Sequence, residues 1–242
     1  MKANAFVQAG AWNASPNWSR NVVPTANSTA VVQAAATIPS GCVAVAHNVY
    51  LEQGGSITIE DGGLLVHDND GVSVTLLKEI IAYWNDEEGY YLVSSPLVDG
   101  ITPASAGMTD NTYDLYAFCQ DSVGEEWQNQ KVETFSLERG KGYLYANSGA
   151  TTLTYSGAVS GSAEAVSMTI FHEGDVATAS RPRFVLVGNP FVCNATLNCS
   201  YYRLGDDGKT LVVSSDPIAP GEAVFVRATS DNATVTFTRI VQ

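Results

Sequence analysis

The chain has 242 residues, 45% of them hydrophobic and only 15% charged, so it is not a disordered tail and can form one large or two ordinary domains. Its formal net charge of −13 disfavours binding to nucleic acid or to an anionic membrane surface. No stretch approaches the roughly 18 apolar residues of a membrane-spanning helix, so this segment is not expected to insert into a membrane.

Residues 1–30 are polar and turn-rich, and we expect one or two irregular strands that cap the next part. Trp12 and Trp18 are expected to cover the open end of a core; the alternative is a platform for stacking sugar rings. The first residues lack the apolar core of a signal peptide, which leaves a cytosolic protein or a fragment of a longer secreted one. Scarce lysine and a strand-rich composition favour the fragment.

Very short apolar runs alternate with glycine-containing turns over residues 31–76. Ile38 and Ile57 are 19 positions apart, and so are Val45 and Leu64. A period near twenty predicts a short parallel β-solenoid, because each coil needs chain reversals at which glycine supplies a positive φ. Only about two coils fit, so the solenoid must stack on another element or continue N-terminally. An antiparallel meander is the alternative.

The C-terminal part contains the same motifs twice in the same order. Residues 90–96 (YYLVSSP) reappear at 183–190 (RFVLVGNP), 140–146 (GKGYLYA) at 221–227 (GEAVFVR), and 152–155 (TLTY) at 234–237 (TVTF). This indicates a duplication. Short strands separated by Gly, Pro and Asn turns predict an antiparallel β-sandwich or jelly roll.

The predicted fold is therefore all-β, with two parts. Residues 1–82 are expected to form a β-solenoid-like segment with an irregular N-terminal cap. Residues 83–242 are expected to form a β-sandwich of two related halves, 83–157 and 183–242, joined by a linker over 158–182.

The four cysteines are Cys42, Cys119, Cys193 and Cys199. A bridge between Cys193 and Cys199 would close a short loop; the alternative is buried thiols that act as small hydrophobic residues. The histidines are scattered and no Cys-x-x-Cys pair occurs, which disfavours a zinc site.

Catalytic motifs are missing from the sequence. It has neither Gly-x-Ser-x-Gly nor a glycine-rich phosphate loop, and its acidic residues fall in loops where they are expected to be solvated. We therefore predict no catalytic residues and expect the chain not to be an enzyme.

Aromatic and acidic residues flank the middle loops, where the two copies differ. A flat ring can stack on the apolar face of a sugar while carboxylates bind its hydroxyls. The predicted ligand-binding residues are Trp127, Tyr116, Glu125, Glu126, Tyr202 and Asp206. The alternative is that the tyrosines are half-buried strand residues.

Calcium is the ion that the sequence favours, and no other cofactor is expected. Oxygen ligands lie beside glycine turns in Asp68-Asn69-Asp70-Gly71 and Asp206-Asp207-Gly208. The candidate ligands are Asp68, Asp70, Asp206 and Asp207. The alternative is that these residues are present because Asp and Asn favour turns.

The motifs at 186–191 (LVGNPF), Tyr201-Tyr202 and 218–228 (IAPGEAVFVRA) resemble a recurrent C-terminal module of large Bacteroidetes surface and secreted proteins. The resemblance covers residues 83–242, and residues 38–63 resemble the short β-solenoid that precedes such modules. Phe184 departs from the usual Trp-Asn, and no Lys-rich sorting tail follows Gln242. The resemblance implies an extracellular or outer-surface location within a longer exported protein, and no established catalytic residues.

The expected function is that of a non-catalytic extracellular accessory module of a bacterial surface protein, serving adhesion or glycan binding. The expected partner is a polysaccharide or a host or cell-surface glycoprotein. Alternatives are a purely structural stalk or spacer and, less favoured, a fragment of a polysaccharide-degrading enzyme.

Overall fold

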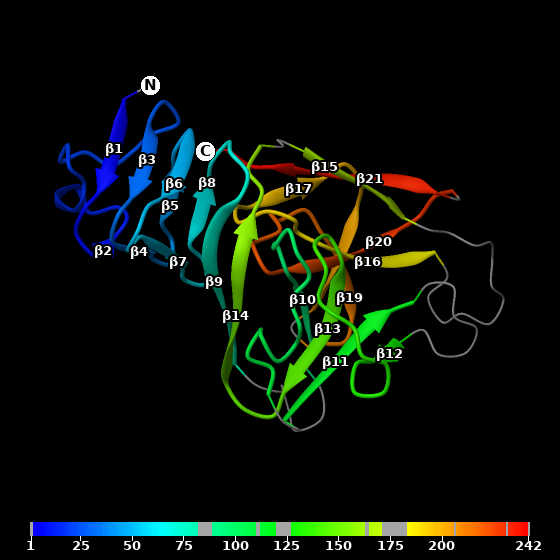
Figure 1. Cartoon of the computed structure of the whole chain (residues 1–242). Helices are drawn as coiled ribbons and strands as arrows, with labels where there is room; N and C mark the ends of the chain where they lie inside the picture. The colour runs from blue at the N-terminus through cyan, green and yellow to red at the C-terminus, as the bar shows by residue number, and fades with distance from the viewer. Residues whose placement is uncertain are drawn as a thin grey trace.

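The computed structural model describes residues 2–81, 89–109, 112–119, 127–162, 165–170, 183–205, 207–230 and 232–241 (Figure 1). Apart from one short 3₁₀ turn, η1 (Ser15–Asn17), the regular elements of these residues are strands, so the predicted all-β class is confirmed. Over the same residues, no helix is long and apolar enough to cross a membrane.

The N-terminal part is a parallel β-solenoid. Its strands are β1 (Ala3–Phe6), β2 (Gly10–Ala11), β3 (Thr29–Val32), β4 (Ala35–Ile38), β5 (Val43–Val45), β6 (Asn48–Leu51), β7 (Ser56–Ile59) and β8 (Leu64–Val66). Strands from successive coils pair in parallel as β1-β3-β6, β2-β4-β7 and β5-β8. This pairing confirms the solenoid and excludes the meander for these residues.

The predicted pairing of residues 19 positions apart is wrong in two of the three solenoid sheets, β2-β4-β7 and β5-β8. Strands β3 and β6 pair 19 positions apart, but Ile38 pairs with Ile59 and Val45 with Val66, each 21 positions apart. The corner after β6 (52–55) has two more residues than the corner after β3 (33–34), which shifts everything after it. Gly55 closes this longer corner, where a Cβ would lie 1.9 Å from the carbonyl oxygen of Val32.

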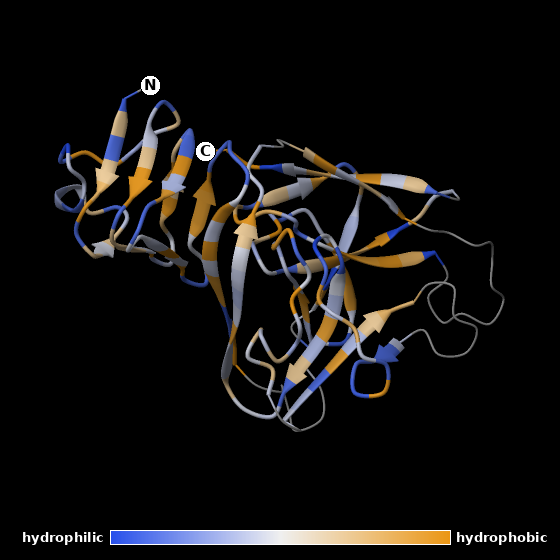
Figure 2. Cartoon of the chain, in the orientation of Figure 1, coloured by the Kyte–Doolittle hydropathy of each residue, from blue (hydrophilic) through white to orange (hydrophobic). Residues whose placement is uncertain are grey.

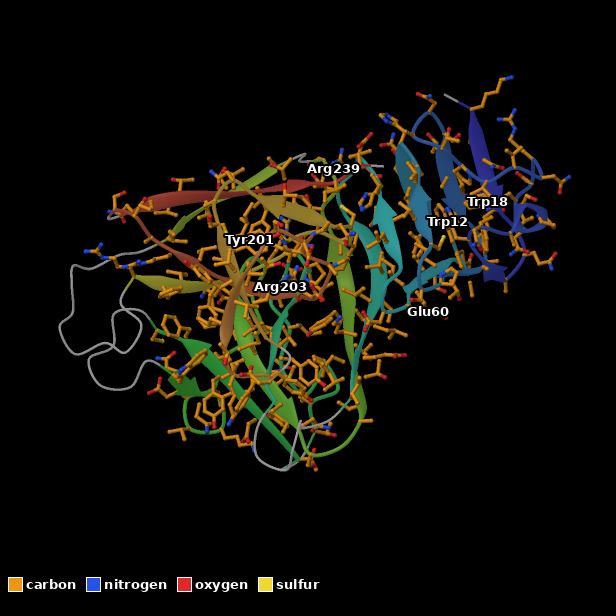
Figure 3. The ribbon with its side chains drawn as sticks, turned by 180° about the vertical axis from the view of Figure 1, so that it is seen from behind. Trp12, Trp18, Glu60, Tyr201, Arg203 and Arg239 are labelled. Atoms are coloured by element: carbon orange, nitrogen blue, oxygen red, sulfur yellow. The ribbon has the colours of Figure 1, made fainter. Side chains whose placement is uncertain are left out.

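The N-terminal cap closes the solenoid core with two tryptophans, as expected. Trp12 and Trp18 are 0% and 1% exposed, and their rings meet edge to face at 4.8 Å (Figure 3). The Trp18 indole donates a hydrogen bond to the carbonyl oxygen of Trp12 (2.7 Å). Buried in this way, neither ring can serve as a platform for sugars.

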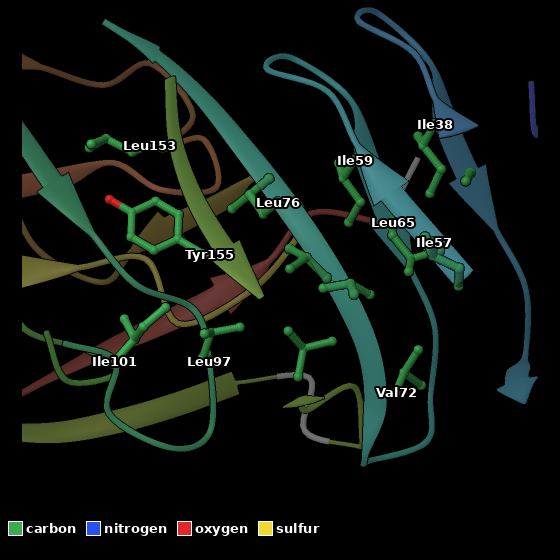
Figure 4. Packing of buried hydrophobic residues seen from close by; sticks show 14 of the residues in the cluster. Ile38, Ile57, Ile59, Leu65, Val72, Leu76, Leu97, Ile101, Leu153 and Tyr155 are labelled. Carbon is green, nitrogen blue, oxygen red and sulfur yellow. The ribbon is translucent and has the colours of Figure 1, made fainter. Parts of the chain in front are cut away.

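The solenoid continues into the first repeated half without a break in the sheet. Strand β9 (Val72–Ile80) pairs in parallel with β7 and, along nine residues, antiparallel with β14 (Thr151–Val159). The apolar core is continuous as well, passing from Ile38 and Ile59 through Leu76 to Tyr155 (Figure 4). The solenoid-like segment and the first half therefore share one sheet and one core.

The duplication appears as two antiparallel sheets with the same strand order. The first is β10-β13-β11-β12 and the second is β16-β20-β18-β19. Their strands are β10 (Tyr91–Ser94), β11 (Tyr113–Phe118), β12 (Trp127–Asn129), β13 (Gly142–Asn147), β16 (Phe184–Gly188), β18 (Tyr201–Leu204), β19 (Leu211–Ser214) and β20 (Ala223–Arg227). Repeated motifs thus occupy equivalent strands, which the order of motifs along the chain anticipated.

Each sheet packs one face against closing strands of its own half. The first packs on β14 and β9, and the second on β21 (Ala233–Arg239), β15 (Ala165–Ile170) and β17 (Ala195–Leu197). Strand β15 lies within the stretch 158–182 that was expected to be a linker, and it pairs with β21 as β9 pairs with β14. The linker prediction is therefore wrong for residues 165–170, because their exposed polar residues alternate with apolar ones as in a strand.

The remaining faces of the two sheets meet at a junction that we call the seam. Leu186 and Phe225 form its buried centre, with Leu92, Phe118 and Trp127 against them. Figure 2 shows that β16 and β20 are mainly hydrophobic along their length.

The seam is self-complementary, like a two-fold dimer interface. The Ser94 N–H donates to the carbonyl oxygen of Gly221 (2.9 Å), and at the equivalent positions the Gly188 N–H donates to that of Gly140 (2.9 Å). Two isolated antiparallel bridges show the same two-fold relation between the halves: Val93 pairs with Glu222, and at the equivalent positions Val187 pairs with Lys141.

Cys193 and Cys199 are thiols in this structure and are not joined by a disulfide. Cys193 packs in the core of the second half, where burial raises the pKa of its thiol to about 12. It therefore acts as a small hydrophobic residue, as in the second of the two alternatives.

Candidate functional site

Two clefts flank the seam, one for each half. The first cleft, of about 350 Å³, lies between β9, β10 and the turn before β20. The second cleft, of about 740 Å³, lies between β15, β16 and the turn before β13. Residues 91–93 line the first and their equivalents 185–187 line the second, so the two clefts are copies of one feature.

The same turn closes each cleft. The turns are residues 138–141 and 219–222, and in each the N–H of the fourth residue donates to the carbonyl oxygen of the first at 3.2 Å. The third residue of each turn is a glycine with a positive φ: +82° at Gly140 and +77° at Gly221. This is a type II turn, which requires a positive φ at that position. A Cβ on Gly140 would meet Met168, and one on Gly221 would meet Lys78, so Met168 and Lys78 occupy equivalent places.

The two clefts differ in charge at the equivalent positions. Where the first cleft has Lys78 and Glu222, the second has Met168 and Lys141. Arg203 on β18 also lines the first cleft. Its equivalent on β11 is Ala117, because Tyr202 and Tyr116, the residues before them, pair with equivalent positions of β20 and β13. One copy of the feature is thus charged, and the other is mainly apolar.

Glu222 is the centre of the charged network in the first cleft. Its Oε2 accepts hydrogen bonds from Arg203 Nη1 (2.8 Å) and from the N–H of Ala219 (3.1 Å), and its Oε1 lies 3.6 Å from Lys78 Nζ. Lys78 Nζ also donates to Asp61 Oδ1 (3.0 Å), a residue of the solenoid. Burial by itself raises the pKa of Glu222, but Arg203 and Lys78 outweigh it and lower that pKa below its usual value.

Arg203 is held in place by the chain beyond the cleft. Its Nη2 donates to the carbonyl oxygens of Pro217 (2.8 Å) and Asp216 (3.2 Å), and the guanidinium lies 6.0 Å from the ring of Tyr201 (Figure 3). The Tyr201 hydroxyl donates to the same Asp216 carbonyl. The cation is therefore fixed before any ligand arrives, which lowers the entropic cost of binding.

Two of the three predicted aromatic residues, Trp127 and Tyr202, belong to the apolar cluster of the seam. Tyr116 and Tyr202 occupy equivalent positions: Tyr116 packs edge to face on Tyr90 (6.4 Å), and Tyr202 packs on Phe184 (5.4 Å). Tyr90 itself lines the first cleft. Both predicted tyrosines are half-buried strand residues, as in the alternative considered above.

Trp127 is half-buried and packs on Phe118 (5.0 Å) and Phe225 (6.0 Å), so it joins the two halves. Trp127 and Tyr202 belong to the same apolar cluster of the seam. Glu125, Glu126 and Asp206 lie outside the described residues.

The acidic residues of the first predicted calcium loop bind protein groups. Asp68 accepts hydrogen bonds from Arg239 Nη2 (2.6 Å) and His47 Nδ1 (2.9 Å). Asp70 accepts from the hydroxyls of Ser160 and Ser162, which, with nearby backbone N–H groups, lower its pKa well below the usual range. Both carboxylates thus connect the solenoid to later parts of the chain.

The second predicted calcium loop is described only in part. Asp207 accepts hydrogen bonds from the Thr210 hydroxyl and from the N–H groups of Lys209 (2.9 Å) and Thr210 (2.8 Å), which lower its pKa to about 2. This is the turn role that aspartate commonly has. Among the described residues, no group of three or more His, Cys, Asp or Glu side chains is placed to hold a metal, and calcium stays a prediction.

Lys78, Arg203, Glu222 and Tyr90 were not predicted as site residues. One signal was present in the sequence: the repeated turn reads Gly-Lys-Gly in the first copy and Gly-Glu-Ala in the second. A reversal of charge at equivalent positions of a duplicated motif marks a place where the copies have different chemistry.

We expect the protein to lose stability as the pH falls from 7 to 5, in part through His67. This ring is 2% exposed; burial, with help from Arg239, lowers the pKa of His67 below 6.5, although Asn69 and Asp68 oppose the shift. Below pH 6.5 the unfolded chain therefore binds a proton that the folded chain does not. This lowers the free energy of unfolding by up to about 1.4 kcal/mol per pH unit.

Urea unfolding of the parent protein and of His67→Gln across this pH range would measure the effect. The stability of the variant should depend less on pH, because glutamine does not titrate. The pKa of Asp68 is lowered in the folded protein, so Asp68 changes the stability only below its ordinary pKa of 3.8. Its contribution therefore does not overlap with that of His67 between pH 7 and 5. Equal pH dependence in the two proteins would contradict this role for His67.

Comparison with known proteins finds no protein family, no curated protein and no solved structure that matches this chain.

Proposed function

We propose that this chain is a non-catalytic extracellular accessory module of a bacterial surface protein and that it binds glycans through the first cleft. The partner is a polysaccharide or a cell-surface glycoprotein, and the role is adhesion. The observation that carries the proposal is the charged network of Lys78, Arg203 and Glu222, which only one of the two equivalent clefts has.

Packing alone does not account for these charges. Removing ions from water costs free energy that an ion pair often fails to recover, so partly buried networks are weak stabilisers. The second half builds the same turn with Met168 and Lys141 in their places. The fold therefore does not need the network, and a ligand-binding role gives a reason for it.

The chemistry of the first cleft suits a hydroxyl-rich ligand. Arg203 and Lys78 donate hydrogen bonds and Glu222 accepts them. Backbone groups of residues 216–219 hold Arg203 and Glu222 in place, and the carboxylates of Asp61 and Glu222 hold Lys78. Tyr90 and Tyr91 line the same cleft and supply aromatic surface. A few fixed polar groups beside aromatic rings are the usual means of binding a small polar molecule.

The arrangement supports binding rather than glycoside hydrolysis. Glu222 is held ionised by two cations, so it is a poor general acid at neutral pH. Glu79 also lines the cleft but follows Lys78 on β9, and successive residues of a strand point to opposite faces. These two carboxylates are therefore not arranged as a facing pair.

A structural stalk or spacer is the second candidate. The observation that favours it is the continuous sheet β14-β9-β7-β4-β2, which joins the solenoid rigidly to the first half. A stalk requires this rigidity and does not require the charged cleft.

Lys78→Met is the test, because methionine already occupies the equivalent position in the second half. We expect glycans that bind the parent protein on an array to bind this variant about tenfold more weakly, since a charged hydrogen bond is lost. Lys131→Met is the matched control, because it removes the charge of a lysine that lies outside the cleft.

Two results would count against glycan binding in the first cleft. A folded parent protein that binds no glycan on the array would favour the stalk. Equal glycan affinity in Lys78→Met and Lys131→Met would place the binding site elsewhere.

A further inference from the structure

The second cleft is a large, mainly apolar cavity that the proposed function does not use. Its volume of about 740 Å³ is in the range of small-molecule sites. The apolar walls come from Val166 and Met168 on β15, Leu186 and Val187 on β16, and Phe118 at the end of β11. Such walls favour a ligand with an apolar body.

Arg139 lines this cleft and has one N–H group that no acceptor in the described part of the chain satisfies. Its Nε donates to the carbonyl oxygen of Pro190 (2.9 Å), while its Nη2 is buried and has no hydrogen-bond partner among the described residues. A buried guanidinium N–H without an acceptor costs free energy. An acceptor supplied by a ligand would remove that cost.

The first cleft shows what the second one lacks. There, Glu222 neutralises the cations from within the chain. At the equivalent position the second cleft has Lys141, whose ammonium reaches out to the exposed Glu138 (2.5 Å). The second cleft therefore has two cations at its turn, and Arg139 has no internal carboxylate in the place that Glu222 fills in the first cleft.

We propose that the second cleft binds a small amphiphilic carboxylic acid. The carboxylate accepts hydrogen bonds from Arg139, whose planar guanidinium matches a carboxylate in geometry. The apolar body lies along Met168 and Val166 of β15 and Leu186 of β16. This site is independent of the glycan site, because none of its lining residues lines the first cleft.

Decanoate titrated into the whole chain, followed by calorimetry and by the NMR signals of the Met168 methyl group, tests the proposal. We expect saturable binding of decanoate, and binding at least about tenfold weaker for decanol and decylamine, which cannot accept from Arg139 as a carboxylate does. Arg139→Gln should weaken decanoate binding by a similar factor, whereas Arg20→Gln, an exposed arginine of the cap, should leave it unchanged.

Met168→Glu keeps the test decisive if Arg139→Gln fails to fold. It puts an internal carboxylate into the second cleft, so it should abolish decanoate binding while the protein keeps its thermal stability. The proposal would be overturned by decanol binding as tightly as decanoate, by unchanged decanoate affinity in Met168→Glu, or by no decanoate binding to the parent protein. None of these results bears on glycan binding in the first cleft.

Discussion

Gly188→Ala is expected to destabilise the protein by ~3 kcal/mol, as overpacking at a tight junction does. A Cβ at this position would lie 2.3 Å from the Cβ of Ser94 and 2.5 Å from the carbonyl oxygen of Lys141. The backbone cannot easily yield, because the Gly188 N–H is bonded across the seam to Gly140. The free energy of unfolding in urea, compared with that of the parent protein, measures the effect.

The two-fold relation of the halves supplies a sharper control. Ser94 is the equivalent of Gly188, and its hydroxyl donates to the carbonyl oxygen of Glu222 (2.8 Å). Only one of these two positions has room for a side chain. The exchange variant Ser94→Gly/Gly188→Ser moves that side chain to the other half and should be at least ~1 kcal/mol more stable than Gly188→Ser alone. Simple addition of the two single effects would argue against a self-complementary seam.

The all-β class and the repeated strands were predictable because their causes are local. Alternation at 234–238 and the repeated stops at Pro96 and Pro190 follow from the geometry of strands and from proline's lack of an N–H. The solenoid register was not predictable from its apolar runs. It depends on the length of the corner at 52–55, which contributes no apolar residue to the pattern.

The first cleft was not predictable because its residues come together only when the halves dock. Lys78 lies on β9, which joins the solenoid to the first half, whereas Arg203 and Glu222 belong to the second half. No local pattern encodes that meeting. The sequence predicts Trp127 as a ligand-binding ring, whereas the structure packs it at the seam. A strand pattern cannot show that a second sheet covers the face on which the ring lies.

Asn189→Ala is expected to cost ~4 kcal/mol, the largest effect of a single polar substitution that we expect in this chain. Asn189 is 0% exposed, and its Nδ2 donates to the carbonyl oxygens of Cys193 (2.9 Å) and Ile218 (2.8 Å). Its Oδ1 accepts from the Phe191 N–H (3.0 Å). Alanine would leave the Cys193 carbonyl oxygen and the Phe191 N–H buried without partners, whereas the Ile218 carbonyl oxygen would keep its hydrogen bond from the Ala195 N–H (3.0 Å). Chemical unfolding would measure the loss.

Asn189→Ser separates the contributions, because the first half already has serine at this position. Ser95 accepts a hydrogen bond from the N–H two residues ahead (Leu97, 3.3 Å), as Asn189 does from Phe191, but its short side chain provides no counterpart to the two amide bonds. The serine variant should therefore keep one of the three hydrogen bonds and cost ~2 kcal/mol, less than alanine. Equal losses for serine and alanine would mean that the Gly-Asn-Pro motif is retained for its turn geometry and not for the hydrogen bonds of its amide.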